Sequence, residues 1–421
     1  MKKILLSAVI ITASLSANAQ KVTKLSSSLS PELYGMAISE NGKFLGGSDN
    51  ESRAFIYNTE TGIIKFYGHN TTGDESYTVD SDLRDINNDG VGVGYVAEVA
   101  TKFDFNTGAQ TAIDETTNES SLAKYISADG SIVSYMTYGN TYNQTPYWKK
   151  DGVAHKLQTT SDDWIGYETN GFVVEKGNAD GSVLMGYAVD NFATNPLFIW
   201  VKNHNEDTYS IIQLSRRFFD GSYEWNQPQP CDVFTGGAIS ANGRWVAINW
   251  HNKNDFDGGE KVARYDLTTD SITFLDCPAD SYIASGITDD GTIVGFYGDD
   301  WTRNGFICKA GETEVKNLAD AFPNSAEIAE MESNGNTVTD ITSDGRYILG
   351  FTDEYVDDIP SVVTYVIDTK DSETSIKSAT DNSNNSIVAS YTVDGKRANA
   401  TNRGVMINKM SSGIVKKSIR K

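Results

Sequence analysis

A short pattern that recurs seven times constrains the fold of this chain more than any other feature. In each copy an apolar residue, a small polar residue, any residue, and Asp or Asn precede a glycine, and a short apolar run follows. Successive glycines lie 40 to 62 residues apart, a period that suits one blade of a propeller. They are Gly42, Gly90, Gly130, Gly181, Gly243, Gly291 and Gly345.

Each copy predicts a hairpin, because Asp-Gly or Asn-Gly between two apolar runs supplies the positive φ angles of a tight turn. A third apolar run follows, as in residues 196–200, and a second turn leads to a fourth run that ends in a residue such as Leu157 or Leu318. One four-stranded sheet cannot bury its own faces, but seven packed radially can. We therefore predict an all-β fold, a seven-bladed β-propeller of four-stranded antiparallel blades.

The sixth copy, residues 287–318, resembles the HAF-type repeats of bacterial extracellular proteins, whose unit is similar to Ile-Asn-x-x-Gly-x-Ile-Val-Gly. The fourth copy departs from the pattern, because Gly177 stands where the others carry Ile. The resemblance covers roughly residues 33–368 and implies a propeller-like architecture. It implies no single activity and brings no catalytic residues.

The first 19 residues predict a secretory signal peptide. Lys2 and Lys3 precede the apolar run 4–15, and Ala17-Asn18-Ala19 is a small-x-small cleavage site. The alternative is a membrane helix, but the run is shorter than the roughly 20 residues of a span. We expect a secreted or outer-surface protein that starts at Gln20, with no transmembrane span in the mature chain.

Two segments are candidates for the fourth strand of the last blade. Residues 21–25 look like a fourth strand and precede the first copy, so pairing with the last copy would close the ring and hide two sheet edges. Residues 375–377 are the rival. The sequence favours the N-terminal strand.

The composition changes after the last copy. Residues 371–385 are rich in Ser, Thr, Asn and Asp and predict a linker, so the propeller is expected to span 20–370. Residues 386–421 hold eight Lys or Arg and one acid, in a chain whose net charge is −22. Three alternating runs, 387–393, 404–408 and 414–419, predict a short β-rich tail.

The tail resembles the C-terminal sorting sequence of secreted Bacteroidetes proteins. The similar segments are 391–397, 403–407 and 412–417. The resemblance implies that the secretion machinery recognises the tail and exports the protein by type IX secretion. The alternative is a basic terminus without a sorting role.

Charge and cysteine content exclude some functions. A net charge of −22 repels phosphate backbones, so nucleic acid is not an expected partner. Three cysteines allow at most one disulfide, and Cys308 in an apolar run is expected to be buried.

No motif predicts a metal site or a cofactor. Residues 85–90 resemble the start of an EF-hand loop, but Val96 stands where the bidentate Glu belongs, and the run also fits the second turn. No two of the four His lie within four residues of each other. Adjacent acids such as Asp299 and Asp300 could serve a glycosidase, although solvated surface is their commoner role.

Aromatic residues in the predicted loops suggest a ligand-binding face. Loops of variable length over a rigid scaffold commonly carry binding, and flat rings beside polar groups suit a sugar. The alternative is that these rings pack the long loops onto the scaffold. The candidate residues are Trp164, Tyr223, Trp225, Trp250, Trp301, Asp300 and Tyr142.

The resulting hypothesis is a secreted propeller that acts as a non-catalytic binding module for an extracellular glycan or protein. The alternative is a glycan-active hydrolase or lyase that uses carboxylates on the variable loop face.

Overall fold

The computed structural model describes seventeen stretches of the chain, which divides into two compact units, Met1–Asp371 and Ser372–Lys421. The predicted leader, 1–19, and the predicted linker, 371–385, lie outside the described residues. The described residues are 20–25, 30, 32–68, 80–114, 120–138, 144–159, 169–190, 197–204, 206–214, 233–251, 259–278, 281–298, 303–356, 359–370, 387–392, 404–410 and 415–420.

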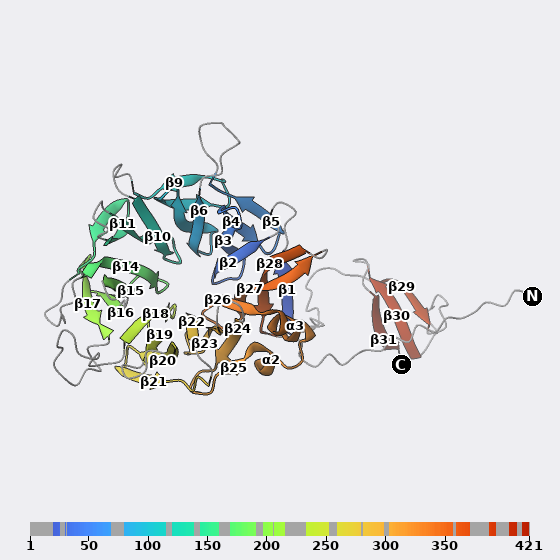
Figure 1. Ribbon diagram of the computed structural model, residues 1–421. Coiled ribbons are helices and arrows are strands. Elements are labelled where there is room, and N and C mark those ends of the chain that lie inside the picture. The colour runs from blue at the N-terminus through green and yellow to red at the C-terminus, as the bar shows by residue number, and fades with distance from the viewer. Residues whose placement is uncertain are drawn as a thin grey trace, which may run out of the picture. The chain divides into compact units, whose positions relative to one another are not determined.

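Four-stranded antiparallel sheets make up most of the first unit, and Figure 1 shows the sheets following one another around a common centre. Four of these sheets are built from consecutive strands. They are β2 (Leu33–Ile38), β3 (Phe44–Asp49), β4 (Ala54–Asn58) and β5 (Ile63–Phe66); β6 (Ser81–Ile86), β7 (Val91–Val96), β8 (Val99–Asp104) and β9 (Gln110–Ala112); β18 (Val233–Ile239), β19 (Trp245–His251), β20 (Lys261–Asp266) and β21 (Ser271–Phe274); and β22 (Tyr282–Ile287), β23 (Ile293–Tyr297), β24 (Asn304–Cys308) and β25 (Lys316–Asn317).

An eight-stranded sheet lies between the second and third of these. Its halves are β10 (Ser120–Ile126), β11 (Ile132–Tyr138), β12 (Gln144–Lys150) and β13 (Val153–Lys156), and β14 (Thr169–Gly177), β15 (Val183–Asp190), β16 (Leu197–Lys202) and β17 (Tyr209–Gln213). One parallel pair, Gln144 with Gly171, joins the halves. A buried cluster that includes Trp148 from one half and Trp200 from the other separates their faces. Each half therefore packs as a four-stranded sheet of its own.

The last sheet of the unit combines both ends of its sequence. It contains β26 (Asn336–Ile341), β27 (Tyr347–Val356), β28 (Ile359–Asp368) and the N-terminal strand β1 (Lys21–Leu25). β1 pairs with β28 from Lys21 opposite Asp368 to Leu25 opposite Thr364. The prediction that the N-terminal strand completes this sheet is confirmed, and the rival segment 375–377 lies outside the described residues.

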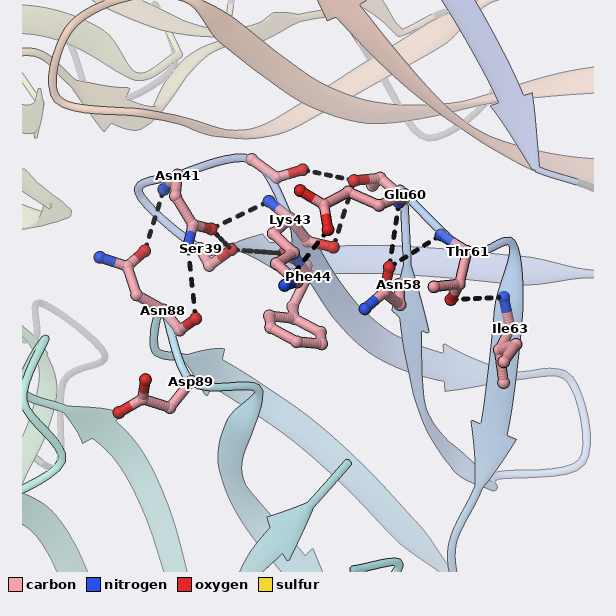
Figure 2. A network of polar contacts seen from close by, with 12 residues as sticks. Ser39, Asn41, Lys43, Phe44, Asn58, Glu60, Thr61, Ile63, Asn88 and Asp89 are labelled. Carbon is pink, nitrogen blue, oxygen red and sulfur yellow. Dashed lines mark hydrogen bonds and ion pairs between the residues drawn. The ribbon is translucent and has the colours of Figure 1, made fainter. Parts of the chain in front are cut away.

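The repeated turn is closed by polar side chains as well as by its glycine. All seven glycines have φ between 68° and 93°, as predicted, but the Asp or Asn before each one stays at negative φ. In the first turn (Figure 2), Asn41 Oδ1 accepts hydrogen bonds from the Lys43 N–H (2.9 Å) and the Ser39 hydroxyl (2.8 Å). Ser39 Oγ in turn accepts from the Phe44 N–H at 2.9 Å. The small polar residue and the Asp or Asn are thus needed to hold the turn.

Hydrogen bonds also join neighbouring turns. The Asn41 N–H donates to Asn88 Oδ1 at 2.9 Å (Figure 2), and the Asn242 N–H donates to Asp289 Oδ1 at 2.8 Å. The Ser343 N–H donates to Glu40 Oε2 at 2.7 Å and so links the last turn to the first. These bonds hold the first strands of the sheets side by side.

Apolar clusters lie between successive sheets. Phe44 and Phe103 belong to the cluster between the first two sheets, and Phe55 and Leu349 to the cluster between the last sheet and the first. Cys308 is fully buried, which confirms the prediction made for it, and Trp148 and Trp200 are at most 1% exposed. Burying each large ring contributes roughly 1.5–3 kcal/mol.

The connection between β25 and β26 is helical. It contains the helices α2 (Leu318–Ala321) and α3 (Ala326–Asn334). Ser325 caps α3 by accepting a hydrogen bond from the Ile328 N–H, and Ile328 and Met331 bury one face. A cap followed by good helix formers explains the helix.

The second unit is a three-stranded antiparallel sheet. Its strands are β29 (Ile387–Thr392), β30 (Gly404–Met410) and β31 (Val415–Arg420). β30 is the central strand and pairs with both others. The strands coincide with the three alternating runs of the sequence.

Candidate functional site

The first strand of each of the seven four-stranded groups in the first unit carries a β-bulge, which skips the residue two positions before the Ile or Gly of the repeat in six of them and three positions before Ile239 in β18. In β6, for example, the register shifts between Leu83 and Asp85 and leaves Arg84 unpaired. A bulge adds one residue to a strand and redirects its side chains. The residues skipped in this way are Met36, Arg84, Lys124, Glu175, Gly236, Ser285 and Thr339.

Six of these seven residues line one cavity of about 490 Å³, which also contacts aromatic rings from three strands. The rings are Tyr34 on β2, Phe296 on β23 and Phe351 on β27. Tyr34 and Phe351 meet edge to face, with centroids 5.4 Å apart. The volume lies within the range of small-molecule sites, roughly 300–1,000 Å³. We call this cavity the wide chamber.

Charged side chains surround the wide chamber. Arg84 pairs with Asp82 at 2.5 Å, and Lys124 pairs with Glu175 on the neighbouring strand β14. Lys176 and Arg303 add two further cations, and the guanidinium of Arg303 lies 5.1 Å from the centroid of Phe296. The Nε of Arg84 is buried and has no hydrogen-bond partner among the described residues. The chamber thus offers donors next to apolar ring faces.

A second, narrower cavity of about 100 Å³ shares Lys176 and Ser285 with the wide chamber. We call it the narrow chamber. The isoleucine of six repeats and the glycine of the fourth line it: Ile38, Ile86, Ile126, Gly177, Ile239, Ile287 and Ile341.

Tyr125 explains why the fourth repeat carries glycine. A Cβ on Gly177 would lie 2.7 Å from both the Tyr125 ring and Leu184 Cδ2. The Tyr125 hydroxyl donates to the Asn178 carbonyl at 2.5 Å, which fixes the ring in this place. The departure from the repeat pattern therefore makes room for an aromatic side chain.

Two half-buried aspartates join neighbouring first strands. Asp85 accepts hydrogen bonds from the Ile86 and Ile126 N–H groups, both at 2.9 Å. Asp340 accepts from Ile341 at 2.9 Å and from Ile38 at 3.0 Å. The two residues occupy the same position of the repeat, on β6 and β26.

Burial controls the protonation of both aspartates. It raises the pKa of Asp85 to about 6, while Lys176 and the Ile126 N–H act in the opposite direction. Burial also raises the pKa of Asp340, again against Lys176. Lys176 is thus the cation that both carboxylates face, although none of the described residues forms an ion pair with it within 4.0 Å.

Comparison with solved structures identifies the fold. The chain is similar to oligogalacturonate lyase from Vibrio parahaemolyticus, with 11% identity, a TM-score of 0.50, and coverage of 84% of this chain and 98% of that one. It is also similar to TolB from Acinetobacter baumannii, with 14% identity, a TM-score of 0.40 and coverage of 67% of this chain. The match spans 64% of that TolB chain, less than two thirds of its length. No protein-family model matches the sequence, and no curated protein does.

The first unit has a β-propeller fold. The wide and narrow chambers are therefore successive parts of the central channel of the propeller, because the first strands that line them surround its centre (Figure 1).

Most of the sequence-predicted site residues cannot be placed in this propeller. Trp164, Tyr223, Trp225, Trp301, Asp300 and Tyr142 lie outside the described residues. Trp250, on β19, packs edge to face on Phe274 at 4.7 Å and against the cluster that contains Val246 and Tyr265. These contacts hold the ring on the scaffold, and its role in ligand binding stays a prediction.

Sequence reasoning missed the channel residues. The available signal was the charged pairs Arg84-Asp85 and Glu175-Lys176, which stand directly before the Ile-x or Gly-x step of a first strand. Apolar residues are expected there in a buried strand, so consecutive charges indicate a lined cavity.

The described residues show neither a metal cluster nor a membrane helix. No group of three His, Cys, Asp or Glu side chains in the described ranges is placed to hold a metal ion. In the EF-hand-like segment, Asn87 Oδ1 is occupied by the Asp89 and Val91 N–H groups. No helix in the described part of the chain is long and apolar enough to cross a membrane.

Proposed function

We propose that the first unit is a seven-bladed propeller that acts as a secreted binding module and takes its ligand into the wide chamber. The observation that carries this proposal is the bulge repeated in the first strands, which brings five polar or charged side chains to one cavity of about 490 Å³: Arg84, Lys124, Glu175, Ser285 and Thr339. Repeated bulges beside a cavity are typical of functional sites. An extracellular glycan or protein is the proposed ligand.

Seven blades are supported by the packing between sheets. The eight-stranded sheet behaves as two blades because an apolar cluster separates its halves. Further clusters separate each remaining pair of neighbours, including the last sheet and the first. A closed ring of this kind leaves only short sheet edges exposed.

Binding is tested with a glycan array and a panel of surface proteins, using the chain from Gln20 to Lys421. We expect a ligand that Tyr34→Ala and Phe351→Ala weaken, because both rings line the wide chamber. Trp250→Phe tests the loop-face prediction against the channel. If only Trp250→Phe weakens ligand binding, the site lies on the loop face. If no glycan of the array and no protein of the panel binds, the proposal is overturned.

An enzyme that acts on glycans is the second candidate. The carboxylates of Asp82 and Glu175 both line the wide chamber, and glycosidic cleavage commonly uses two carboxyl groups. The structurally similar protein from Vibrio parahaemolyticus is an oligogalacturonate lyase. Both carboxylates are already paired with cations, which favours binding over acid–base chemistry. Release of shorter glycans from a bound oligosaccharide, lost in Glu175→Gln, would support the enzyme instead.

Export to the cell surface is a separate part of the proposal. It rests on the leader pattern of residues 1–19 and on the basic, β-rich tail that resembles a sorting sequence. Replacing residues 386–421 with a neutral linker should leave the protein in the periplasmic fraction. Unchanged surface delivery would remove the sorting role of the tail.

A further inference from the structure

We propose that the wide chamber recognises an anionic sugar residue, bearing a carboxylate or a sulfate, at the end of a glycan chain. The inference rests on the proposed binding function and specifies its ligand. It follows from the charge of the lining, from one cation without an ion pair, from the ring faces at the chamber and from the size of the narrow chamber.

The charge of the chamber is opposite to that of the molecule. Four cations line it, Arg84, Lys124, Lys176 and Arg303, against the two acids Asp82 and Glu175. The whole chain has a net charge of −22. A cavity with low-dielectric walls focuses the field of its lining. The chamber is therefore a place within the acidic first unit that favours an anion.

Lys176 is placed to meet that anion. It lines both chambers, and the structure places no ion pair within 4.0 Å of it among the described residues. The carboxylates that it faces, Asp85 and Asp340, each accept two backbone N–H bonds. An ammonium group has three donors. Lys176 thus keeps donors for a ligand, and Arg84 adds a second positive charge to the lining.

The aromatic side chains point to a sugar rather than a simple ion. Tyr34, Phe296 and Phe351 line the same chamber as the cations. Apolar ring faces stack on the apolar faces of sugars, whereas an inorganic anion gains nothing from them.

The narrow chamber restricts how far a chain can enter. Its volume of about 100 Å³ compares with about 490 Å³ for the wide chamber. This smaller space is expected to stop a glycan chain at the isoleucine-lined segment. The terminal residue of the chain is then the part that meets Lys176 where the two chambers adjoin.

Calorimetric titration of the full chain from Gln20 tests the inference. The probes are gluco-, galacto-, manno- and guluronate oligosaccharides of two lengths, their neutral counterparts, and sulfated counterparts. We expect an anionic oligosaccharide to bind at least tenfold more tightly than its neutral counterpart, with an affinity per chain that does not depend on length. The uronate and sulfate arms identify the anion.

Variants assign the effect to the chamber. Lys176→Met and, independently, Arg84→Met should each weaken anion binding about tenfold or more, the usual contribution of a charge-assisted hydrogen bond. Lys43→Met is the control, because Lys43 pairs with Glu60 on the turn. Two variants are needed because Lys176 also compensates the half-buried aspartates.

Three results would overturn the inference. They are equal binding of neutral and anionic glycans, affinity per chain that rises with length, and unchanged binding in both folded variants. Neutral glycan binding that still depends on Tyr34 and Phe351 would leave the proposed function standing and remove the charge inference alone. Absence of binding by any glycan or protein would remove both.

Discussion

Single residues at the channel combine structural and functional demands. Asp85 and Asp340 each place a carboxylate directly before the isoleucine of their repeat, and that carboxylate accepts hydrogen bonds from two neighbouring strands. The positive charge of Lys176 favours the ionised form of both. Gly177 gives up the isoleucine of the other repeats to admit Tyr125. Substitution of each of these residues should change the free energy of unfolding by an amount that can be measured.

The pH dependence of stability should report on Asp85. Its pKa rises from 3.8 to about 6 on folding, so between these values the folded protein binds more protons than the unfolded chain, and stability falls as pH rises through 6. At about 1.4 kcal/mol for each pKa unit, the free energy of unfolding of wild type should fall by roughly 2.5 kcal/mol more than that of Asp85→Asn between about pH 4 and pH 7. Urea unfolding at both pH values measures the difference.

Glu60→Gln is the control for that experiment, because Glu60 is exposed on a turn. The Asn variant also leaves one backbone N–H without an acceptor, which lowers its stability at every pH by about 1–3 kcal/mol. If the difference in the free energy of unfolding between wild type and Asp85→Asn is the same at both pH values, the prediction is wrong.

Gly177→Ala should destabilise the fold by about 1–3 kcal/mol, because the added methyl group lies within 2.7 Å of Tyr125 and Leu184. In a Tyr125→Ala background the same change should cost much less, since the main obstacle is gone. A double-mutant cycle measured by urea unfolding gives the coupling energy. Additive effects of the two substitutions would show that the ring does not explain the glycine.

At the scale of elements, the bulged first strands form the cavity wall and the short strand β1 completes the last sheet. The bulge in each first strand turns an otherwise regular hairpin into a cavity wall. β1 is only five residues long, yet it pairs with β28 along its whole length. Leu25 at its end is 4% exposed and joins the cluster with Leu33 and Phe55.

Truncating β1 should lower the melting temperature. Leu25→Ala should cost about 2–5 kcal/mol, and deletion of Lys21–Leu25 should cost more because it also removes the ladder with β28. Lys21→Ala is the matched control, since Lys21 is exposed on the same strand. Differential scanning calorimetry measures the shifts, and a deletion variant that melts like wild type would contradict the role of β1.

At the scale of the whole molecule, each sheet is stabilised by two neighbours. Turn-to-turn bonds such as Ser343 to Glu40 and the cluster around Phe55 join the end of the series to its beginning. The acidic surface and the cation-lined channel are likewise properties of the assembled sheets, because the charges that meet in the channel come from different repeats.

The proposed closed ring should unfold in one step. Phe55→Ala and Phe306→Ala remove fully buried rings from clusters on different sides of the unit, and each should cost about 3–5 kcal/mol. Both variants should shift a single calorimetric transition of the first unit by a similar amount. Separate transitions, with each substitution moving only one of them, would indicate an open row of independent sheets.

The sequence by itself determined the local structure. The glycine turns and the four runs of each repeat follow from backbone sterics and alternation, which act over a few residues. The pairing of the N-terminal strand with the last repeat was predicted from the sheet edges that this pairing hides. Helix α3 was open to prediction from Ser325 and the Ala- and Glu-rich run behind it.

Only the tertiary structure decided where chemistry can occur. The charged residues of the channel lie far apart in the sequence, with more than two hundred positions between Arg84 and Arg303. No local rule predicts that they meet each other and Lys124 and Glu175. Their convergence depends on the bulges and on the order of sheets around the centre. The channel exists because side chains from distant repeats are packed around one axis, and that arrangement is a property of the packed sheets rather than of any single repeat.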